Sequence, residues 1–436
     1  MKKEQTEKNE ERNVSKKKTV IITAIVTGIV MFIAGFFTFY LVVGNNARTV
    51  GWIINLIDNY GFYFDEETGE VKKFTADDYA DVICSGLLDR YSDYYNREEY
   101  SEVISTSKGN SYGIGVTIII SDGKTVVYSV LGNSPANKAG MERGDVITAG
   151  FFEGERIEFS SSESFADFIE RIGESENFVL YGERGGEQLT FNVSKKVFKV
   201  SYVNYFDKEK SLSFISEGDA PLTAETGDNG LDLLGDKVAY ISLASFKGGA
   251  AEQIGAALKY MKERGKTKLI LDLRYNGGGY MDVLSDVAAY FVFDEKDGSP
   301  VIAYAGYKNG KSDVFRASGD KFNREITDIV VLANDGTASA SECLIGAMKY
   351  YGRGFDESKL VITKNAEGIA RTYGKGIMQT TYNNIFTGEA IKLTTAYVYQ
   401  PDNETCIHGK GFVAEGDNAV GGDEEALLRA AEILNK

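Results

Sequence analysis

The pattern of apolar and polar positions divides the chain into regions with different periodicities. Residues 19–44 carry no charged side chain, whereas residues 45–108 place apolar residues at helical spacing. Residues 116–130 form two β-branched runs around a Ser-Asp-Gly-Lys turn, and from about residue 200 apolar runs alternate with amphipathic stretches. These patterns predict helices, a β-hairpin and an α/β layer with crossover connections, in that order.

The uncharged stretch of residues 19–44 is long enough to cross a membrane as a helix. Seven basic residues precede it, and Arg48 is the one basic residue among the twenty that follow. This asymmetry predicts a single-pass anchor in the cell membrane, with residues 1–18 in the cytoplasm and the rest outside. A cleaved signal peptide is the alternative, but the apolar stretch exceeds a usual signal sequence and no clear cleavage site follows.

The remaining chain divides into three predicted regions. Residues 45–108 form a small helical region, and residues 109–199 contain the hairpin and a helix that begins with Ser134 as cap and Pro135 in first position. Residues 200–436 form a larger α/β region. Strands are predicted in this region at residues 237–243, 268–273 and 329–333. Helices are predicted at residues 249–264, 281–291 and 424–434.

Charge and cysteine usage exclude two classes of function. The formal net charge of −16 argues against a nucleic-acid binder, whose phosphate contacts need a basic face. Cys84, Cys343 and Cys406 lie far apart, without a Cys-x-x-Cys pair and with a single histidine in the chain. The sequence therefore predicts neither a structural zinc site nor a disulfide framework.

A turn of small residues presents a candidate nucleophile. Asn-Asp-Gly-Thr-Ala-Ser-Ala-Ser-Glu at 334–342 follows an apolar strand and precedes a helix. This order places Ser339 near the helix start, where free N–H groups and the positive dipole end stabilise an oxyanion. That Ser339 or Ser341 only caps the helix is an alternative that the local pattern leaves open. Glu342 is expected to complement the helix N-terminus.

Lysine is the candidate base, because the chain has a single histidine, His408. Lys375 lies between Gly374 and Gly376, which permit close backbone packing around it. A lysine is a general base only when neutral, so burial or positive charge must lower its pKa. Gln379, four residues on, can orient the amine or the serine hydroxyl. A surface lysine is the alternative, and His408 is expected to be structural.

A third motif ends another apolar strand. Asp-Leu-Arg-Tyr-Asn-Gly-Gly-Gly at 272–279 finishes with three glycines, which let backbone N–H groups approach a ligand closely. Such N–H groups can supply the second half of an oxyanion hole. A plain turn is the alternative.

Together these motifs resemble the C-terminal processing peptidases of the S41 family. The likeness spans residues 50–434 and rests on residues 337–342, 374–379, 272–279 and Ile-His-Gly-Lys-Gly at 407–411. Tyr-Gly-Ile-Gly-Val at 112–116 is similar to the carboxylate-binding loop of the PDZ domain of this family, and residues 134–147 to its later half. Leu-Leu-Asp-Arg-Tyr-Ser at 87–92 resembles the helical segment that precedes this domain.

The resemblance implies an α/β fold with a PDZ domain and an S41 peptidase core, and a serine endopeptidase that needs no metal or organic cofactor. Ser339 would be the nucleophile, Lys375 the general base and Gln379 the residue that orients the lysine. The amides of Ala340 and Gly278, or of Gly279, would form the oxyanion hole. Substrates would be proteins or peptides whose free C-termini bind the loop formed by Tyr112, Gly113, Ile114 and Gly115.

Two positions depart from the family pattern. Lys375 follows Ser339 by 36 positions, further than the family leads us to expect, and residues 352–370 are predicted to hold the additional residues in a surface loop. Gly277 stands where a proline or polar residue is commoner.

Two other functions are compatible with parts of the pattern. A non-catalytic PDZ scaffold would bind the C-terminal tails of envelope proteins, but the intact set of Ser339, Lys375 and Gln379 disfavours it. A Ser/Lys amidase or esterase would leave the PDZ domain unexplained. The sequence leaves open whether the chain forms a homo-oligomer.

Overall fold

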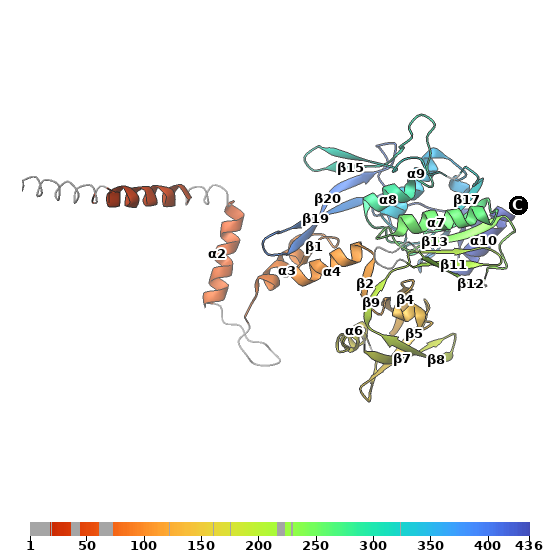
Figure 1. Ribbon diagram of the computed structural model, residues 1–436, viewed down its shortest axis with the longest axis horizontal. Coiled ribbons are helices and arrows are strands. Elements are labelled where there is room, and N and C mark those ends of the chain that lie inside the picture. The colour runs from red at the N-terminus through yellow and green to blue at the C-terminus, as the bar shows by residue number, and fades with distance from the viewer. Residues whose placement is uncertain are drawn as a thin grey trace, which may run out of the picture. The chain divides into compact units, whose positions relative to one another are not determined.

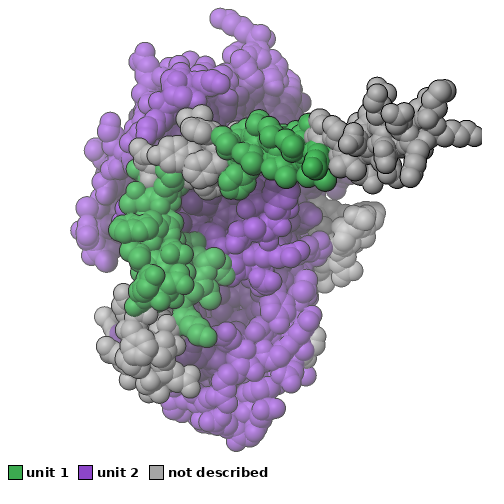
Figure 2. Space-filling model, turned by 90° about the vertical axis from the view of Figure 1, so that its left-hand side faces the viewer, with its two compact units in different colours: residues 1–83 green, residues 84–436 purple. Residues whose placement is uncertain are grey.

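The structure is a computed structural model that describes residues 18, 20–35, 44–60 and 73–436, apart from positions 122, 160, 175, 216–222, 228–229 and 323. The chain divides into two compact units, Met1–Ile83 and Cys84–Lys436 (Figure 2).

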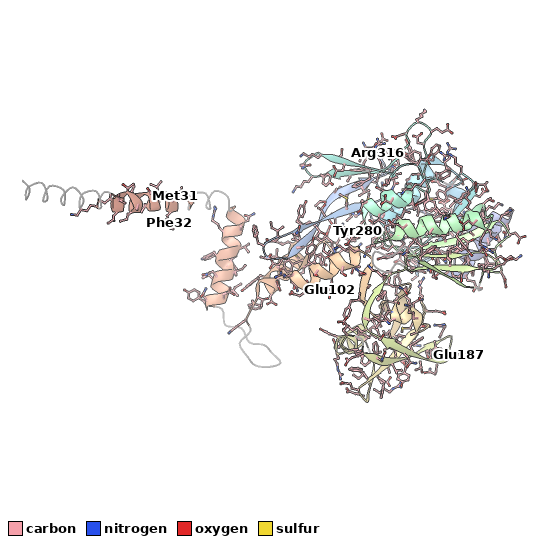
Figure 3. All side chains as sticks on the ribbon, in the orientation of Figure 1. Met31, Phe32, Glu102, Glu187, Tyr280 and Arg316 are labelled. Carbon is pink, nitrogen blue, oxygen red and sulfur yellow. The ribbon has the colours of Figure 1, made fainter. Side chains whose placement is uncertain are left out.

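The described part of the first unit is mainly helical. Residues 20–35 and α2 (Asn45–Tyr60) are helices, and α3 (Ala76–Leu87) begins in this unit. Met31 and Phe32 project from their helix with 71% and 75% of their surface exposed (Figure 3). None of the helices in the described ranges is both long and apolar enough to cross a membrane. The predicted anchor, residues 19–44, includes position 19 and residues 36–43, which lie outside the described residues.

The second unit begins with a segment that was predicted to be helical but that also contains a strand. Helix α4 (Arg97–Ser107) forms as expected, with a capping box in which Asn96 and Glu99 exchange side-chain and backbone hydrogen bonds. Before it, β1 (Asp93–Tyr95) pairs antiparallel with β20 (Ala390–Tyr399). The local sequence did not predict this strand, because its three residues are held by a partner almost 300 positions away.

Residues 109–199 form a β-rich unit (Figure 1). The predicted hairpin is β3 (Val116–Ser121) and β4 (Lys124–Val130), and Ser134 caps α5 (Pro135–Lys138) as expected. Strand β3 lies at the edge of a sheet in the order β3-β4-β5-β7-β8. The other elements are β2 (Asn110–Gly113) paired with β9 (Lys196–Lys199), β5 (Val146–Phe152), β6 (Glu155–Glu158), α6 (Ser162–Glu170), β7 (Asn177–Arg184) and β8 (Glu187–Ser194).

An eight-stranded sheet forms the centre of the remaining chain. Its strands from β13 to β21 are parallel, whereas β10 to β12 extend it antiparallel. In spatial order the strands are β12 (Thr223–Gly227), β11 (Ser211–Ile215), β10 (Val203–Phe206), β13 (Val238–Leu243), β14 (Lys268–Asp272), β17 (Asp328–Ala333), β18 (Leu360–Thr363) and β21 (Ala419–Val420).

Helices cover both faces of this sheet. The inner strands β14 and β17 are apolar on both faces, so Leu269 and Leu271 join one core with α7 (Ala250–Glu263), α8 (Met281–Ala288) and α9 (Ala340–Tyr351). Ile270, between them, joins a second core with α10 (Asp423–Asn435). The predicted alternation of strands and helices is confirmed.

A smaller antiparallel set of strands lies beside this core. Strands β15 (Val301–Tyr307) and β16 (Ser312–Arg316) pair, and β15 and β19 (Ile377–Asn383) both pair with β20. Since β20 also pairs with β1, one long strand joins the lysine-bearing segment to residues 93–95.

The prediction that residues 352–370 form a surface loop is wrong. This segment contains η1 (Glu357–Lys359) and then β18, whose four residues are all buried. Strand β18 lies parallel between β17 and β21. The apolar run Leu-Val-Ile at 360–362 was therefore a signal for an inner strand.

Asp207 anchors the turn that follows β10 to the end of α7. Its buried carboxylate accepts hydrogen bonds from Arg264, from the Tyr205 hydroxyl and from the N–H groups of Glu209 and Lys210. Burial alone would raise the pKa of Asp207, but the Arg264 guanidinium and these N–H groups together lower it to about 2.

We expect Asp207→Asn to lower the free energy of unfolding by about 2 kcal/mol at pH 7. Because the folded pKa lies below the unfolded value, this stabilisation is complete above about pH 4 and is lost as the pH falls toward 2. Denaturant unfolding of both proteins across this range measures it. Asp320→Asn, which removes an exposed pair with Arg324, is the matched control. Equal stability of Asp207→Asn and wild type at pH 7 would contradict the prediction.

Candidate active site

The loops that follow β13, β14 and β17 are cross-linked at one edge of the eight-stranded sheet. The Asn276 side chain donates to the Leu243 carbonyl at 2.8 Å. Its backbone carbonyl accepts from Ala338 N at 3.0 Å and from the Ser341 hydroxyl at 2.8 Å. This is the carboxyl edge of the parallel strands, where ligand sites of open α/β sheets lie.

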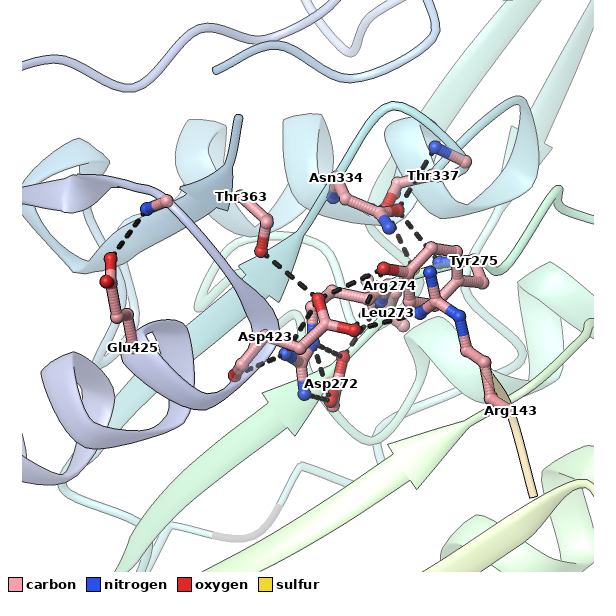
Figure 4. A network of polar contacts seen from close by, with 12 residues as sticks. Arg143, Asp272, Leu273, Arg274, Tyr275, Asn334, Thr337, Thr363, Asp423 and Glu425 are labelled. Atoms are coloured by element: carbon pink, nitrogen blue, oxygen red, sulfur yellow. Dashed lines mark hydrogen bonds and ion pairs between the residues drawn. The ribbon is translucent and has the colours of Figure 1, made fainter. Parts of the chain in front are cut away.

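A second set of contacts fixes the turn after β17 (Figure 4). Asn334 Oδ1 accepts from the N–H groups of Tyr275 and Gly336, at 2.9 and 3.1 Å. The Thr337 hydroxyl donates to the Leu273 carbonyl at 2.8 Å. The small-residue turn is therefore held by the loop after β14 before the helix begins.

Ser339 is the N-cap of α9 and has an unusual backbone. Its φ of 59° and ψ of −117° are rare for a residue with a side chain and cost about 1–3 kcal/mol. Ser341 is fully buried and its hydroxyl is bound to Asn276, whereas Ser339 is half-buried. The geometry thus favours Ser339 over Ser341 as the serine that a substrate reaches.

Glu342 connects the serine turn to the lysine segment. Its Oε2 accepts from the N–H groups of Ser339 and Lys375, both at 2.9 Å. Its Oε1 accepts from the Thr372 hydroxyl at 2.6 Å and from Gly374 N at 2.8 Å. One buried carboxylate therefore brings together two segments that are 36 positions apart.

This bridging role of Glu342 was not predicted from the sequence, which indicated only that the side chain complements the helix N-terminus. Three of its four donors are backbone N–H groups, which carry no residue-specific signal. Burial raises the pKa of Glu342, and the four hydrogen bonds offset part of that rise. The one sequence signal for the bridging role was the position of a glutamate three residues after the candidate nucleophile.

Lys375 is half-buried, and its ammonium lies 4.9 Å from the centre of the Tyr91 ring. Burial lowers the pKa of Lys375, and the nearby charge of Lys392 lowers it further, while Asp89 opposes both. The net direction is the one that a general base requires. The environment that lowers the pKa was not visible in the sequence, because Lys392 and Asp89 are distant along the chain.

The two glycines beside Lys375 pack closely against residues 407–411, as predicted. A Cβ atom on Gly374 would lie 3.0 Å from the backbone nitrogens of Lys410 and Gly411. A Cβ atom on Gly376 would lie 2.6 Å from the His408 nitrogen. The motif around the single histidine thus contributes backbone packing around the lysine.

Among the described residues, neither Gln379 nor His408 has a hydrogen bond to Ser339. Gln379 follows a bulge in β19, and its amide donates to the Thr394 hydroxyl at 3.0 Å. Within the described ranges it has no hydrogen bond to Lys375, so its orienting role stays a prediction. The exposed His408 ring packs edge-on against Tyr397 at 5.8 Å.

Gly278 lies directly against the serine turn, at a φ of 99°. A Cβ atom there would lie 2.8 Å from Ser339 Cβ and 2.9 Å from Ala340 N. The N–H of Gly278 donates to Asn276 Oδ1 at 2.9 Å, whereas no acceptor for the Ala340 N–H is found among the described residues. The structure brings both predicted oxyanion residues to Ser339, and the alternative donor Gly279 adjoins them.

The predicted peptide-binding loop leads into the edge strand β3. Tyr112 and Gly113 end β2, Ile114 is buried, and its carbonyl accepts from Ala136 N at 2.9 Å. Gly115 has a φ of 79° and no room for a Cβ beside Ser134. The exposed Tyr112 ring lies 5.4 Å from the Lys195 ammonium.

Arg143, in the β-rich unit, contacts the loop that carries Gly278 (Figure 4). Its guanidinium lies 3.1 Å from the centre of the Tyr275 ring and donates to Asp423 at 2.9 Å. Asp423 also accepts from the Tyr275 hydroxyl at 2.9 Å. The backbone carbonyl of Asp423 accepts from Arg274, which pairs with Asp272 at the end of β14. This link was not predicted from the sequence.

We expect Gly278→Ala to reduce the turnover of a cleavable substrate by about 100-fold or more, because the added Cβ collides with Ser339 and Ala340. Kinetics with an unstructured peptide measures the effect. Gly277→Ala is the matched control, since a Cβ there meets no atom within 4 Å. Full activity of Gly278→Ala would show that this backbone does not approach the reacting carbonyl.

Lys392→Gln should raise the pKa of Lys375, because it removes a like charge that disfavours the ammonium. A base must be deprotonated to act, so the acidic limb of the rate profile is expected to move to higher pH. The pH dependence of kcat/KM measures the limb. Lys208→Gln removes an exposed lysine elsewhere and should leave it in place. A shift to lower pH would refute the electrostatic effect of Lys392.

Comparison with known proteins connects this site to a family. Residues 237–415 match the family model described as Peptidase family S41. The chain is 26% identical over 400 residues to a probable CtpA-like serine protease of Staphylococcus aureus (strain N315), covering 90% of this chain and 70% of that protein. A second such protein, from Staphylococcus haemolyticus (strain JCSC1435), is 25% identical over 356 residues, covering 81% of this chain and 61% of that protein.

A solved structure has the same fold. The photosystem II D1 C-terminal processing protease aligns with a TM-score of 0.50 and 20% identity, covering 90% of this chain and 98% of that one. At this identity the likeness shows the fold alone. The resemblance to S41 peptidases that the motifs predicted is thereby confirmed, together with the α/β fold of residues 200–436.

Proposed function

We propose that this chain, whose residues 237–415 match peptidase family S41, is a serine endopeptidase with Ser339 as nucleophile and Lys375 as general base. The observation that carries the proposal is the convergence of Ser339 N and Lys375 N on one carboxylate oxygen of Glu342. The lowered pKa of Lys375 and the approach of Gly278 and Ala340 to Ser339 support it.

In the proposed reaction the neutral Lys375 amine takes the proton of the Ser339 hydroxyl as its oxygen attacks the scissile carbonyl carbon. The oxyanion that forms binds the Ala340 N–H and either the N–H of Gly279 or that of Gly278, which must first leave Asn276 Oδ1. The Lys375 ammonium then protonates the leaving amine as the C–N bond breaks. A water then attacks the acyl carbon and gives its proton to Lys375, which passes it to Ser339 Oγ as the ester C–O bond breaks, so that the serine hydroxyl and the neutral amine are restored. Gln379 orients the lysine.

We further propose that residues 109–199 are a PDZ domain that recognises substrate C-termini. An extended peptide can add to the edge strand β3, with its carboxylate at the loop of residues 112–115. The position of this loop directly before β3 supports the assignment. Arg143 of this proposed domain contacts the Tyr275 ring, on the loop that carries Gly278.

The location of the protein rests on the sequence alone. We propose that residues 19–44 anchor the chain in the cell membrane and that residues 45–436 lie outside the cytoplasm. The uncharged stretch and the basic residues before it support this orientation.

Ser339→Ala should abolish cleavage of an unstructured peptide, and Lys375→Met should reduce kcat by at least about 1,000-fold, because they remove the nucleophile and the base. Peptide cleavage assays measure both rates, and labelling with an active-serine probe reports the reactivity of Ser339. Ser312→Ala and Lys308→Met, at exposed positions away from the site, are the matched controls. Undiminished cleavage by Ser339→Ala would refute the assignment.

The rival function is a PDZ scaffold without catalysis. It predicts that a C-terminal peptide binds the chain while the probe leaves Ser339 unlabelled, even with peptide bound. The strained backbone of Ser339 favours the peptidase, because a helix cap needs no such conformation.

A further inference from the structure

The turn of residues 89–92 is fixed against the strand that supports the lysine segment. Asp89 Oδ1 accepts from the N–H groups of Tyr91 and Ser92, at 3.1 and 2.9 Å. The Ser92 hydroxyl accepts from Thr394 N, on β20, at 3.0 Å. The ladder between β1 and β20 continues directly from this turn, so the backbone of Tyr91 has a defined place.

The Tyr91 side chain reaches the base itself. Its ring centre lies 4.9 Å from Lys375 Nζ, within the range of a cation–π interaction. Its hydroxyl lies 3.0 Å from the hydroxyl of Tyr373, two residues before the lysine, and accepts from Arg90 at 2.8 Å. Two contacts on the hydroxyl therefore hold the ring in place over the amine.

We propose that Tyr91 is a positioning residue for the proposed peptidase reaction: its ring face holds Lys375 Nζ and stabilises the ammonium that forms when Lys375 takes the proton of Ser339. The inference rests on the function proposed above. It assigns to a residue outside the peptidase core a part of the general-base step, while Gln379 bonds to Thr394 instead of the lysine.

An aromatic ring suits this place better than a carboxylate. A carboxylate beside Lys375 would keep the amine protonated, and a protonated lysine cannot take the serine proton. A ring carries no net charge, so it favours the ammonium only modestly and leaves intact the burial that lowers the pKa of Lys375. The base therefore stays available and its protonated form still has a partner.

The electrostatic setting of the amine comes from several elements. Lys392 on β20 lowers the pKa of Lys375, and Asp89 on the turn opposes it. Other charged or titratable groups that face the pair from the described part of the chain are Arg90, Tyr373 and the Glu342 carboxylate, which binds the lysine backbone. Replacing Tyr91 by leucine leaves each of these charged groups in place.

The test compares Tyr91→Phe with Tyr91→Leu in the full chain, using kcat, KM and the pH profile on one peptide substrate. Tyr91→Phe keeps the ring face and should stay within about 3-fold of wild type. Tyr91→Leu keeps an apolar side chain but loses the ring, so kcat should fall by about 5- to 30-fold with little change in KM. Its acidic limb should move to lower pH, because the ammonium has lost its partner.

Tyr290→Leu is the matched control, since it removes a ring 5.3 Å from another ammonium, that of Lys321, away from the site. It should leave kcat and the limb unchanged. Thermal unfolding is followed for every variant, and Tyr91→Met replaces Tyr91→Leu if the latter does not fold. A merely structural role would lower the amount of folded enzyme and leave the limb in place.

If the wild type is active, two results would overturn the inference and leave the proposed function intact. One is equal activity of Tyr91→Phe and Tyr91→Leu. The other is an acidic limb of the pH profile of Tyr91→Leu that stays in place or moves to higher pH. A wild type without Ser339-dependent cleavage would overturn the proposed function and this inference with it. The two failures are therefore distinguishable.

Discussion

The arrangement of the site depends on the buried carboxylate of Glu342. It binds the backbone of the serine turn and of the lysine segment at once, and its four donors offset much of the cost of burying it. Without it, those donors would lose their acceptor inside the protein, at about 1–3 kcal/mol each. The separation of Ser339 and Lys375 along the chain then matters little, because one side chain holds both ends.

Around this contact the site is built largely from backbone. Ser339 and Tyr275 are non-glycine residues with positive φ, on the two loops that meet at the carboxyl edge of the sheet. Gly278, Gly374 and Gly376 let those loops approach other backbone more closely than a Cβ would allow. The strain at Ser339 is held by hydrogen bonds to Glu342 and by the packing of Gly278 against the turn.

Two segments from outside the central sheet contact opposite parts of the proposed machinery. Arg143, from the β-rich unit, lies against Tyr275 on the loop that carries Gly278. Tyr91, from the segment before that unit, lies against Lys375. The proposed recognition of a substrate C-terminus and the proposed chemistry therefore occupy parts of the chain that are in direct contact.

The sequence by itself determined the elements whose signals are local. Apolar periodicity predicted β13, β14, β17, α7 and α10, and the motifs selected Ser339, Lys375 and the glycines at 277–279. Strand β1 was missed and β18 was assigned to a loop, since the first depends on a distant partner and the second was judged by spacing instead of by its apolar run.

Only the tertiary structure decided what surrounds those residues. The choice between Ser339 and Ser341, the bridge from Glu342 to Lys375, the contact of Lys375 with Tyr91 and the effect of Lys392 on its pKa all depend on residues from separate segments of the chain. A motif names the residue type that a reaction needs. The pKa and orientation of that residue follow from its neighbours in space, and these exist only once the chain has folded.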